Sequence, residues 1–143
     1  MRRDVLLKIT GKQKYDQHSD KIELTTNGTL EETEDAYIIR YIEENEQPIG
    51  EAKVKVTVKK DASEVMNERI QPSGNSCLVI KENVRSICAY STPYGMMSMG
   101  IFGKKIEYFI DDSYGEFKLK YTIDFDGHTG SYNDLIITFK EKD

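Results

Sequence analysis

The sequence lacks most of the residues from which catalytic and metal sites are built. It contains no Trp, only two His and only two Cys among its 143 residues. The cysteines, Cys77 and Cys88, are not in CxxC spacing and have no His nearby, so neither a redox motif nor a zinc site is supported. We therefore expect two buried, reduced thiols, no cofactor and no enzymatic activity.

Long apolar runs and an excess of positive charge are also absent. Near the start only Val5, Leu6 and Leu7 stand together, far short of the ~7–15 apolar residues of a signal-peptide core. The formal net charge is −5 and the isoelectric point is about 5.2, which disfavours binding to the phosphates of nucleic acid. These features predict a cytoplasmic protein that binds neither nucleic acid nor membrane.

Residues that favour β-sheet are abundant. Val, Ile and Thr together number 32, whereas Ala and Leu, two of the best helix formers, together number 11. The clearest periodicity covers 52–58, where Ala and Val alternate with Lys and Thr, and a second covers 117–125. Apolar residues at every second position predict strands with one buried and one solvated face. Shorter runs of this kind occur at 5–9, 22–24, 37–41, 65–70, 77–80 and 135–139.

Turn-forming residues separate these runs at short intervals. Asp, Ser and Gly at 111–115 and 126–130 predict tight hairpins. No segment sustains a helical period, although 84–89 could form a short turn. We predict an all-β fold in which 1–143 form a single domain, an antiparallel up-and-down β-barrel of about eight to ten strands. A β-sandwich is the alternative.

Residues 86–103 form an 18-residue stretch without a charged side chain. Its length approaches that of a membrane span, but Pro93, three Gly and four Ser or Thr residues predict a hairpin that turns near 92–95. Lack of charge on both strand faces predicts that both faces are covered. We expect Met96, Met97 and Met99 to pack mainly in the core, with pocket lining as the alternative.

The run Tyr-Ser-Thr-Pro-Tyr-Gly at 90–95 is distinctive. With Glu68-Arg69 before it and Gly115, Tyr121 and an Asn-x-Leu-x-Ile segment at 133–137 after it, the chain resembles the YwiB-like family of small bacterial proteins. The resemblance spans most of the chain and implies a lipocalin-like, calycin-type β-barrel. It implies no catalytic or ligand residues, because the family is of unknown function. The sequence departs from the family pattern at 70–74, where a different turn is expected.

Motifs for catalysis and metal binding are incomplete. Ser98 lacks the first Gly of a nucleophile elbow. Asp124, Asp126 and His128 share one strand parity, but Leu135 stands where a calcium loop requires Glu, so only adventitious metal binding is conceivable. The acidic pairs at 31–32, 43–44 and 111–112 stand in hydrophilic surroundings, and we interpret them as turn and edge residues.

Arg69 is the polar residue with the strongest claim to a role in binding. It shares one strand face with Val65 and Asn67, and inside a barrel its guanidinium could anchor a carboxylate. The preferred interpretation is nonetheless an ion pair on the outer face, because single charged residues on strands are usually solvated.

Together these features predict a non-enzymatic barrel that binds a small, partly apolar molecule in its interior. The alternative is a filled-core structural or interaction module, acting as a homodimer or protein-binding regulator through an apolar patch that includes Ile38, Ile42 and Phe109. The candidate ligand-lining residues are Tyr41, Arg69, Tyr90, Tyr94, Met97, Met99 and Tyr121.

Overall fold

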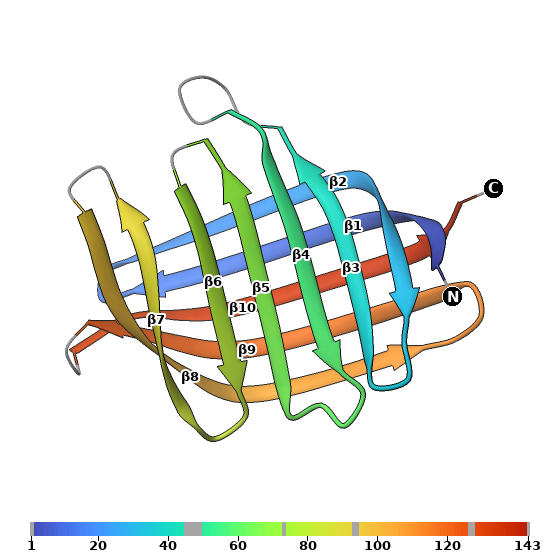
Figure 1. Ribbon diagram of the computed structural model, residues 1–143. Coiled ribbons are helices and arrows are strands. Elements are labelled where there is room, and N and C mark those ends of the chain that lie inside the picture. Colours follow the sequence, from blue (N-terminus) through green and yellow to red (C-terminus); the bar gives the residue numbers. More distant parts are fainter. Residues whose placement is uncertain (1, 45–49, 73, 93–94, 126–127, 143) are drawn as a thin grey trace.

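The computed structural model describes residues 2–44, 50–72, 74–92, 95–125 and 128–142, with the backbone alone at 90–92 and 129. Within these ranges the chain forms ten β-strands and no helix (Figure 1). The strands are β1 (Arg2–Tyr15), β2 (His18–Glu32), β3 (Ala36–Glu43), β4 (Ala52–Lys59), β5 (Glu64–Gln71), β6 (Gly74–Lys81), β7 (Arg85–Thr92), β8 (Gly95–Ile110), β9 (Tyr114–Phe125) and β10 (His128–Glu141).

Each strand pairs antiparallel with its neighbours in the sequence, and β1 pairs with β10, so the sheet closes into a barrel (Figure 1). This confirms the predicted all-β, up-and-down barrel, and the sandwich alternative is wrong. The short turn expected at 84–89 is also wrong, because Arg85–Thr92 is strand β7. Inward-facing and outward-facing side chains alternate along this strand, but the sequence does not show it, because no charged residue from 86 onward marks the solvent-facing positions.

Strand β4 shows how alternation in the sequence defines the inside of the barrel. Val54, Val56 and Val58 are almost fully buried, whereas the Lys and Thr residues between them are at least partly exposed. Residues directly opposite each other on antiparallel strands point to the same side of the sheet. The strand register therefore identifies the inward-facing residues of each neighbouring strand in turn.

One end of the barrel is filled by aromatic side chains. The rings of Tyr37, Tyr108, Phe117 and Phe139 contact one another in succession, with centroids 5.5–6.3 Å apart. The Tyr108 hydroxyl donates a hydrogen bond of 2.7 Å to the backbone carbonyl of Lys60 in the turn between β4 and β5. Aromatic pairs of this kind add about 0.5–1.5 kcal/mol beyond their area burial, so this end is a structural closure.

At the other end of the barrel, inward-facing side chains of the described residues remain exposed. Ile22 and Met97 share the inward parity of the buried Leu30 and Ile101 on their own strands, yet they are 65% and 46% exposed. Such side chains are much less covered than those at the aromatic end. Within the part of the chain that the structure describes, the barrel therefore has a packed base and, at the opposite end, an accessible mouth.

The uncharged segment at 86–103 is only half covered. β7 and β8 form the predicted hairpin, whose turn at 93–94 lies outside the described residues. Its inward residues Cys88 and Ile101 are buried, but Ile87 and Met96 are exposed. Core packing is therefore wrong for Met96 and Met97, and only Met99 packs against the core. A strand face built from small, hydroxyl-bearing and apolar residues can face solvent without carrying charge.

Candidate functional site

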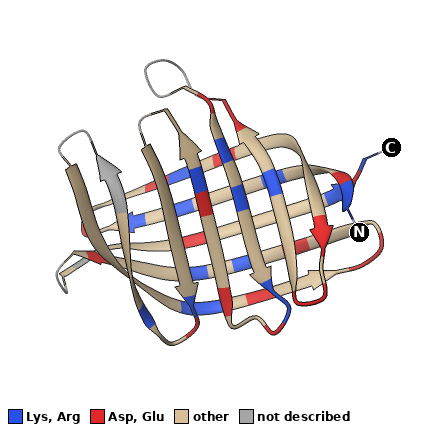
Figure 2. Ribbon diagram, viewed as in Figure 1, with Lys and Arg blue, Asp and Glu red and all other residues tan. Residues whose placement is uncertain are grey.

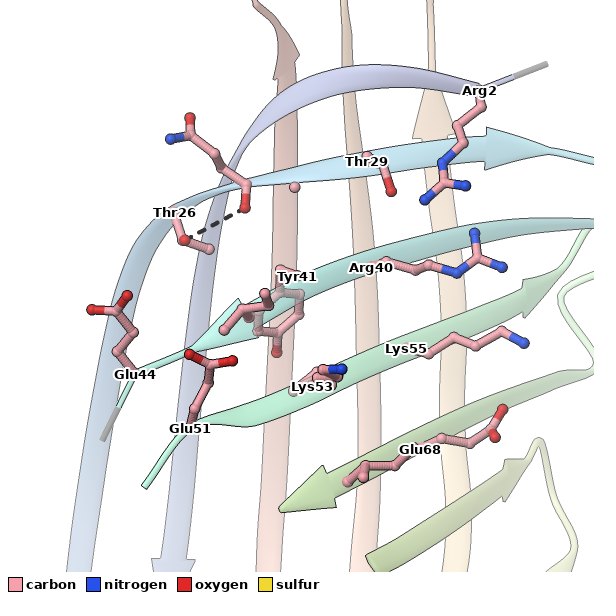
Figure 3. Close-up of a pocket in the computed structure, with 15 residues that line it drawn as sticks. Arg2, Thr26, Thr29, Arg40, Tyr41, Glu44, Glu51, Lys53, Lys55 and Glu68 are labelled. Atoms are coloured by element: carbon pink, nitrogen blue, oxygen red, sulfur yellow. Dashed lines mark hydrogen bonds between the residues drawn. The ribbon is translucent and has the colours of Figure 1, made fainter. Parts of the chain in front are cut away.

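A groove of about 520 Å³ crosses β2, β3, β4 and β5 (Figure 3). Its volume lies within the ~300–1,000 Å³ of typical small-molecule sites. Register places most of its lining side chains on the outer face of the sheet, opposite to the buried valines of β4. The lining residues are Arg2, Thr26, Asn27, Gly28, Thr29, Arg40, Tyr41, Ile42, Glu44, Glu51, Lys53, Val54, Lys55, Glu68 and Ile70.

The floor of the groove is apolar. Ile42 and Ile70 lie on either side of Lys53 in the strand register, and both isoleucines are exposed. The aliphatic stem of Lys53 can extend this apolar surface while its ammonium group stays in water. A ligand that covered these side chains would remove apolar area from water, which favours binding.

The positive groups gather at one end of the groove, where Figure 3 shows Arg2, Arg40 and Lys55. Arg40 donates a hydrogen bond of 2.7 Å to Glu31, and this bond holds the pKa of Glu31 below its usual value. Arg2 lies opposite the same carboxylate in the register, so one Glu31 faces two guanidinium groups. Lys55 stands between Arg40 and Glu68 in the register but forms no ion pair within 4 Å among the described residues.

Negative groups gather at the opposite end, where Figure 3 shows Glu44 and Glu51. On the ribbon, blue and red bands also adjoin on β4 and β5 (Figure 2). The groove therefore has a basic end, an acidic end, and between them a middle in which Lys53 lies between two exposed isoleucines (Figure 3).

Two residues of β2 shape the groove wall. A Cβ atom on Gly28 would lie 2.5 Å from the Arg40 carbonyl oxygen and from Leu7 Cδ1, so no side chain fits between β1 and β3 at this point. The next residue, Thr29, has a buried hydroxyl oxygen without a hydrogen-bond partner among the described residues. An unsatisfied buried polar group costs about 1–3 kcal/mol, and a polar ligand in the groove could recover part of that cost.

Tyr41 supports the groove from the inner face of β3. It lies opposite the buried Val54, and its ring packs against the core. Burial raises the pKa of Tyr41 to about 12, with the nearby Glu43 carboxylate raising it further and Arg69 opposing them. The phenol therefore stays neutral at physiological pH and contributes packing and polarity without charge.

The family was identified by comparing the sequence with models of known families. The match to the domain of unknown function DUF1934 covers residues 7–137. The chain belongs to this family. The structure is also similar to the crystal structure of the ywiB protein from Bacillus subtilis, with a TM-score of 0.84 and 20% sequence identity over 99% of this chain and 94% of that one. This confirms the resemblance seen in the sequence. No functionally curated protein matches the sequence significantly.

Within this DUF1934 barrel, Arg69 lies on the inner side of the sheet. It stands opposite the buried Val54, so the preferred outer-face position is wrong. An ion pair is present, because the Arg69 guanidinium lies 2.6 Å from the carboxylate of Glu43, and Arg69 also donates to Gln71. The inward position follows from the strict alternation that β5 shares with β4. Because Glu43 already balances its charge, Arg69 is not available as a carboxylate anchor.

The other predicted lining residues fall into separate groups. Of the predicted lining residues whose side chains the structure describes, only Tyr41 lines the groove. Tyr121 lines a smaller hollow inside the barrel, and Met97 and Met99 face the interior on β8. Tyr90 pairs with Met97 through its backbone, and Tyr94 lies outside the described residues. The sequence did not reveal the groove. A usable signal was present, because the lysines of β4 stand between two strands that each carry an isoleucine near the end, Ile42 on β3 and Ile70 on β5.

Metal and thiol chemistry gain no support from the geometry. In the described part of the chain, no three His, Cys, Asp or Glu residues come close enough to hold a metal ion. Asp124 instead forms a bidentate ion pair with Arg85, and Asp126 lies outside the described residues. Both cysteines are free, but only Cys88 is buried and Cys77 is half-exposed. A membrane-crossing helix is likewise not found in the ranges described.

Proposed function

We propose that this protein is a non-enzymatic binding protein for a small, partly apolar molecule that carries a carboxylate. The observation that supports this proposal is the groove over β2–β5, which joins an exposed apolar floor to a basic end. The proposed occupant lays its apolar part over Ile42 and Ile70 and its carboxylate toward Arg2 and Lys55.

The charge balance favours an anion at this end. Three positive groups, Arg2, Arg40 and Lys55, face two carboxylates, Glu31 and Glu68, which leaves one positive charge uncompensated. A ligand carboxylate would restore neutrality, and hydrogen bonds between guanidinium or ammonium groups and carboxylates are among the stronger ones in proteins.

Binding without turnover is supported by the kind of residues present. The residues that line the groove include no His, Cys or Ser, so the described surface offers no nucleophile paired with a general base. Its tyrosine, Tyr41, is held neutral by burial. These side chains can recognise a molecule, but they lack the parts needed to transform it.

The test compares two fluorescent probes that differ in one group. Dansylglycine carries an apolar ring system and a carboxylate, and dansylamide carries the same rings without the carboxylate. We expect saturable binding with fluorescence enhancement for dansylglycine and weaker binding for dansylamide. Lys55→Gln should weaken dansylglycine binding by up to about fivefold and leave dansylamide unchanged, because a half-exposed charge pair is worth up to about 1 kcal/mol.

Two controls separate this proposal from its rival. Lys120→Gln removes a similar charge from the outer face of β9, away from the groove, and should not change either affinity. Light scattering at micromolar concentration should show a monomer. Equal affinity for both probes would refute the carboxylate, and a dimer that Ile70→Asp dissociates would favour the interaction module instead.

A further inference from the structure

A second polar site lies on the inner wall of the barrel, near the open mouth and away from the groove. Four residues lie opposite one another on adjacent strands, all with the inward parity: Asp20 on β2, Gln13 on β1, Asn133 on β10 and Tyr121 on β9. This continuous polar row differs from the middle of the same strands, where the inward residues Leu7, Ile9 and Ile137 are apolar and buried. Burial raises the pKa of Tyr121, so its hydroxyl remains neutral.

Asn133 is the buried member of this row, and its amide group is only partly hydrogen-bonded. It is only 5% exposed, and its side-chain amide nitrogen lies 3.0 Å from the Ser131 hydroxyl and 3.5 Å from the Tyr121 carbonyl oxygen. Its oxygen, Oδ1, accepts no hydrogen bond from any described residue. Exchanging the amide oxygen and nitrogen would leave a buried N–H group unsatisfied in the same place, so either orientation carries a cost.

A hollow of about 80 Å³ adjoins this row. It exists because residue 11 is glycine: a Cβ there would meet no atom within 4 Å. Ile22 and Leu135, which lie on either side of Gly11 in the register, make its apolar wall, and Ile22 is exposed toward the mouth. At ~30 Å³ per water molecule the hollow holds only a group of a few heavy atoms.

On the inner wall the polar groups around this hollow are rich in acceptors, whereas Lys12 and Asp134, which also line it, have the outward parity and lie opposite each other. Asn133 Oδ1 lacks a donor, the Gln13 amide oxygen receives one hydrogen bond from Tyr15, and Asp20 contributes a carboxylate. The partner found for Asp20 is His18, at 3.2 Å and near the surface. A matching ligand therefore brings several donors and a positive charge, together with a short apolar chain for Ile22 and Leu135.

We infer that this inner site binds a small primary ammonium ion with a short alkyl chain. The ammonium group donates to Asn133 Oδ1, the Asp20 carboxylate and the Gln13 amide oxygen, which uses its three donors. The alkyl chain enters the hollow beside Gly11. This site is separate from the groove and uses charge of the opposite sign, so the two proposals can fail independently.

The test is an NMR titration of the isotope-labelled protein with n-propylammonium chloride, and 1-propanol and sodium propionate serve as matched probes. The side-chain amide signals of Asn133, assigned by their loss in Asn133→Leu, report on the site directly. We expect a saturable shift with propylammonium and at least tenfold weaker binding of propanol and propionate. Sodium chloride at the same concentration controls for ionic strength.

Three variants test the geometry. Asp20→Asn removes the charge at an exposed position and should weaken propylammonium binding about tenfold. Gly11→Val fills the hollow at a backbone position of ordinary conformation and should abolish binding while the fold, followed by circular dichroism, is retained. Asp4→Asn, at an exposed outward position of β1 that does not line the hollow, should have no effect.

The outcomes are decisive for the inner site. Equal affinity for propanol and propylammonium would overturn the ammonium assignment. The absence of a saturable shift would show that water alone satisfies Asn133. If Asn133→Leu does not fold, the Asp20 and Gly11 variants still decide the question, and unchanged dansylglycine binding in them would show that the groove is independent.

Discussion

Replacement of Gly100 by Ala should destabilise the barrel by breaking an ion pair. Gly100 lies on β8, directly opposite Asp124 on β9 and Ile87 on β7. A Cβ atom there would come within 2.5 Å of Nε and Nη2 of Arg85 and of Oδ2 of Asp124. The guanidinium of Arg85 thus lies across the glycine to reach Asp124, with hydrogen bonds of 2.9 and 2.6 Å.

The expected loss is about 1–2 kcal/mol. Hydrogen bonds to charged groups contribute about 1.5–3 kcal/mol to stability. The Arg85 side chain is 46% exposed and that of Asp124 is 12% exposed, so solvent screening places this pair near the lower limit. Gly→Ala at an ordinary backbone conformation returns about 0.4–1 kcal/mol through the unfolded chain, which offsets part of the loss.

Urea unfolding followed by far-ultraviolet circular dichroism measures this change, because the chain has no Trp to report by fluorescence. The midpoint should fall without a change in slope, and the melting temperature should fall by about 2–8 °C. The decisive comparison repeats Gly100→Ala in an Asp124→Asn background, where the pair is already lost and the substitution should be nearly neutral. An equal loss in both backgrounds would refute the ion-pair explanation.

Two further predictions concern single polar groups. Because burial raises the pKa of Tyr41 from its ordinary value of 10 to about 12, the folded state retains this proton to higher pH than the unfolded state, so stability should fall by roughly 2 kcal/mol as pH rises from 10 to 12. Unfolding measured across this range in wild type and Tyr41→Phe should show a shallower fall in the variant, and identical slopes would exclude Tyr41 as the cause. Thr29→Val removes a buried hydroxyl that no described residue hydrogen-bonds, and should raise the unfolding free energy by about 0.5–1.5 kcal/mol. Thr57→Val on β4 is the control, because the Thr57 hydroxyl is not both buried and unsatisfied. A lower unfolding free energy in Thr29→Val would mean that the Thr29 hydroxyl has a partner in solution.

The sequence was sufficient to predict the barrel because strand alternation is a local signal. Every second residue of β4 is apolar and buried, and on β9 the same alternation buries Phe117 and Leu119, although Phe125 at the end of that strand is exposed. Short turns, such as the one at 111–113, allow consecutive strands to pair only in the antiparallel direction. The up-and-down order of the strands therefore also follows from the sequence.

The sites were harder to predict because they depend on which strands become neighbours and on which end of the barrel is filled. Arg69 and Asn133 have inward parity, but parity alone does not say whether a polar side chain meets a partner. Only the structure places Glu43 beside Arg69 and shows that no described residue donates to Asn133 Oδ1. The lack of nearby charged residues led to the wrong prediction that Met97 is buried, because exposure at the mouth depends on which strands surround it.

The division between the two ends of the barrel explains how polar residues can be retained inside it. The aromatic rings of Tyr37, Tyr108, Phe117 and Phe139 close one end with close contacts that add to the hydrophobic burial there. Because these contacts stabilise the fold at that end, side chains at the mouth need not pack as closely. The fold can therefore tolerate the unsatisfied Asn133 oxygen and the hollow beside Gly11. A bound ligand would then stabilise the fold by its own binding free energy, and an added thermal shift with propylammonium that vanishes in Gly11→Val would link the open mouth to binding.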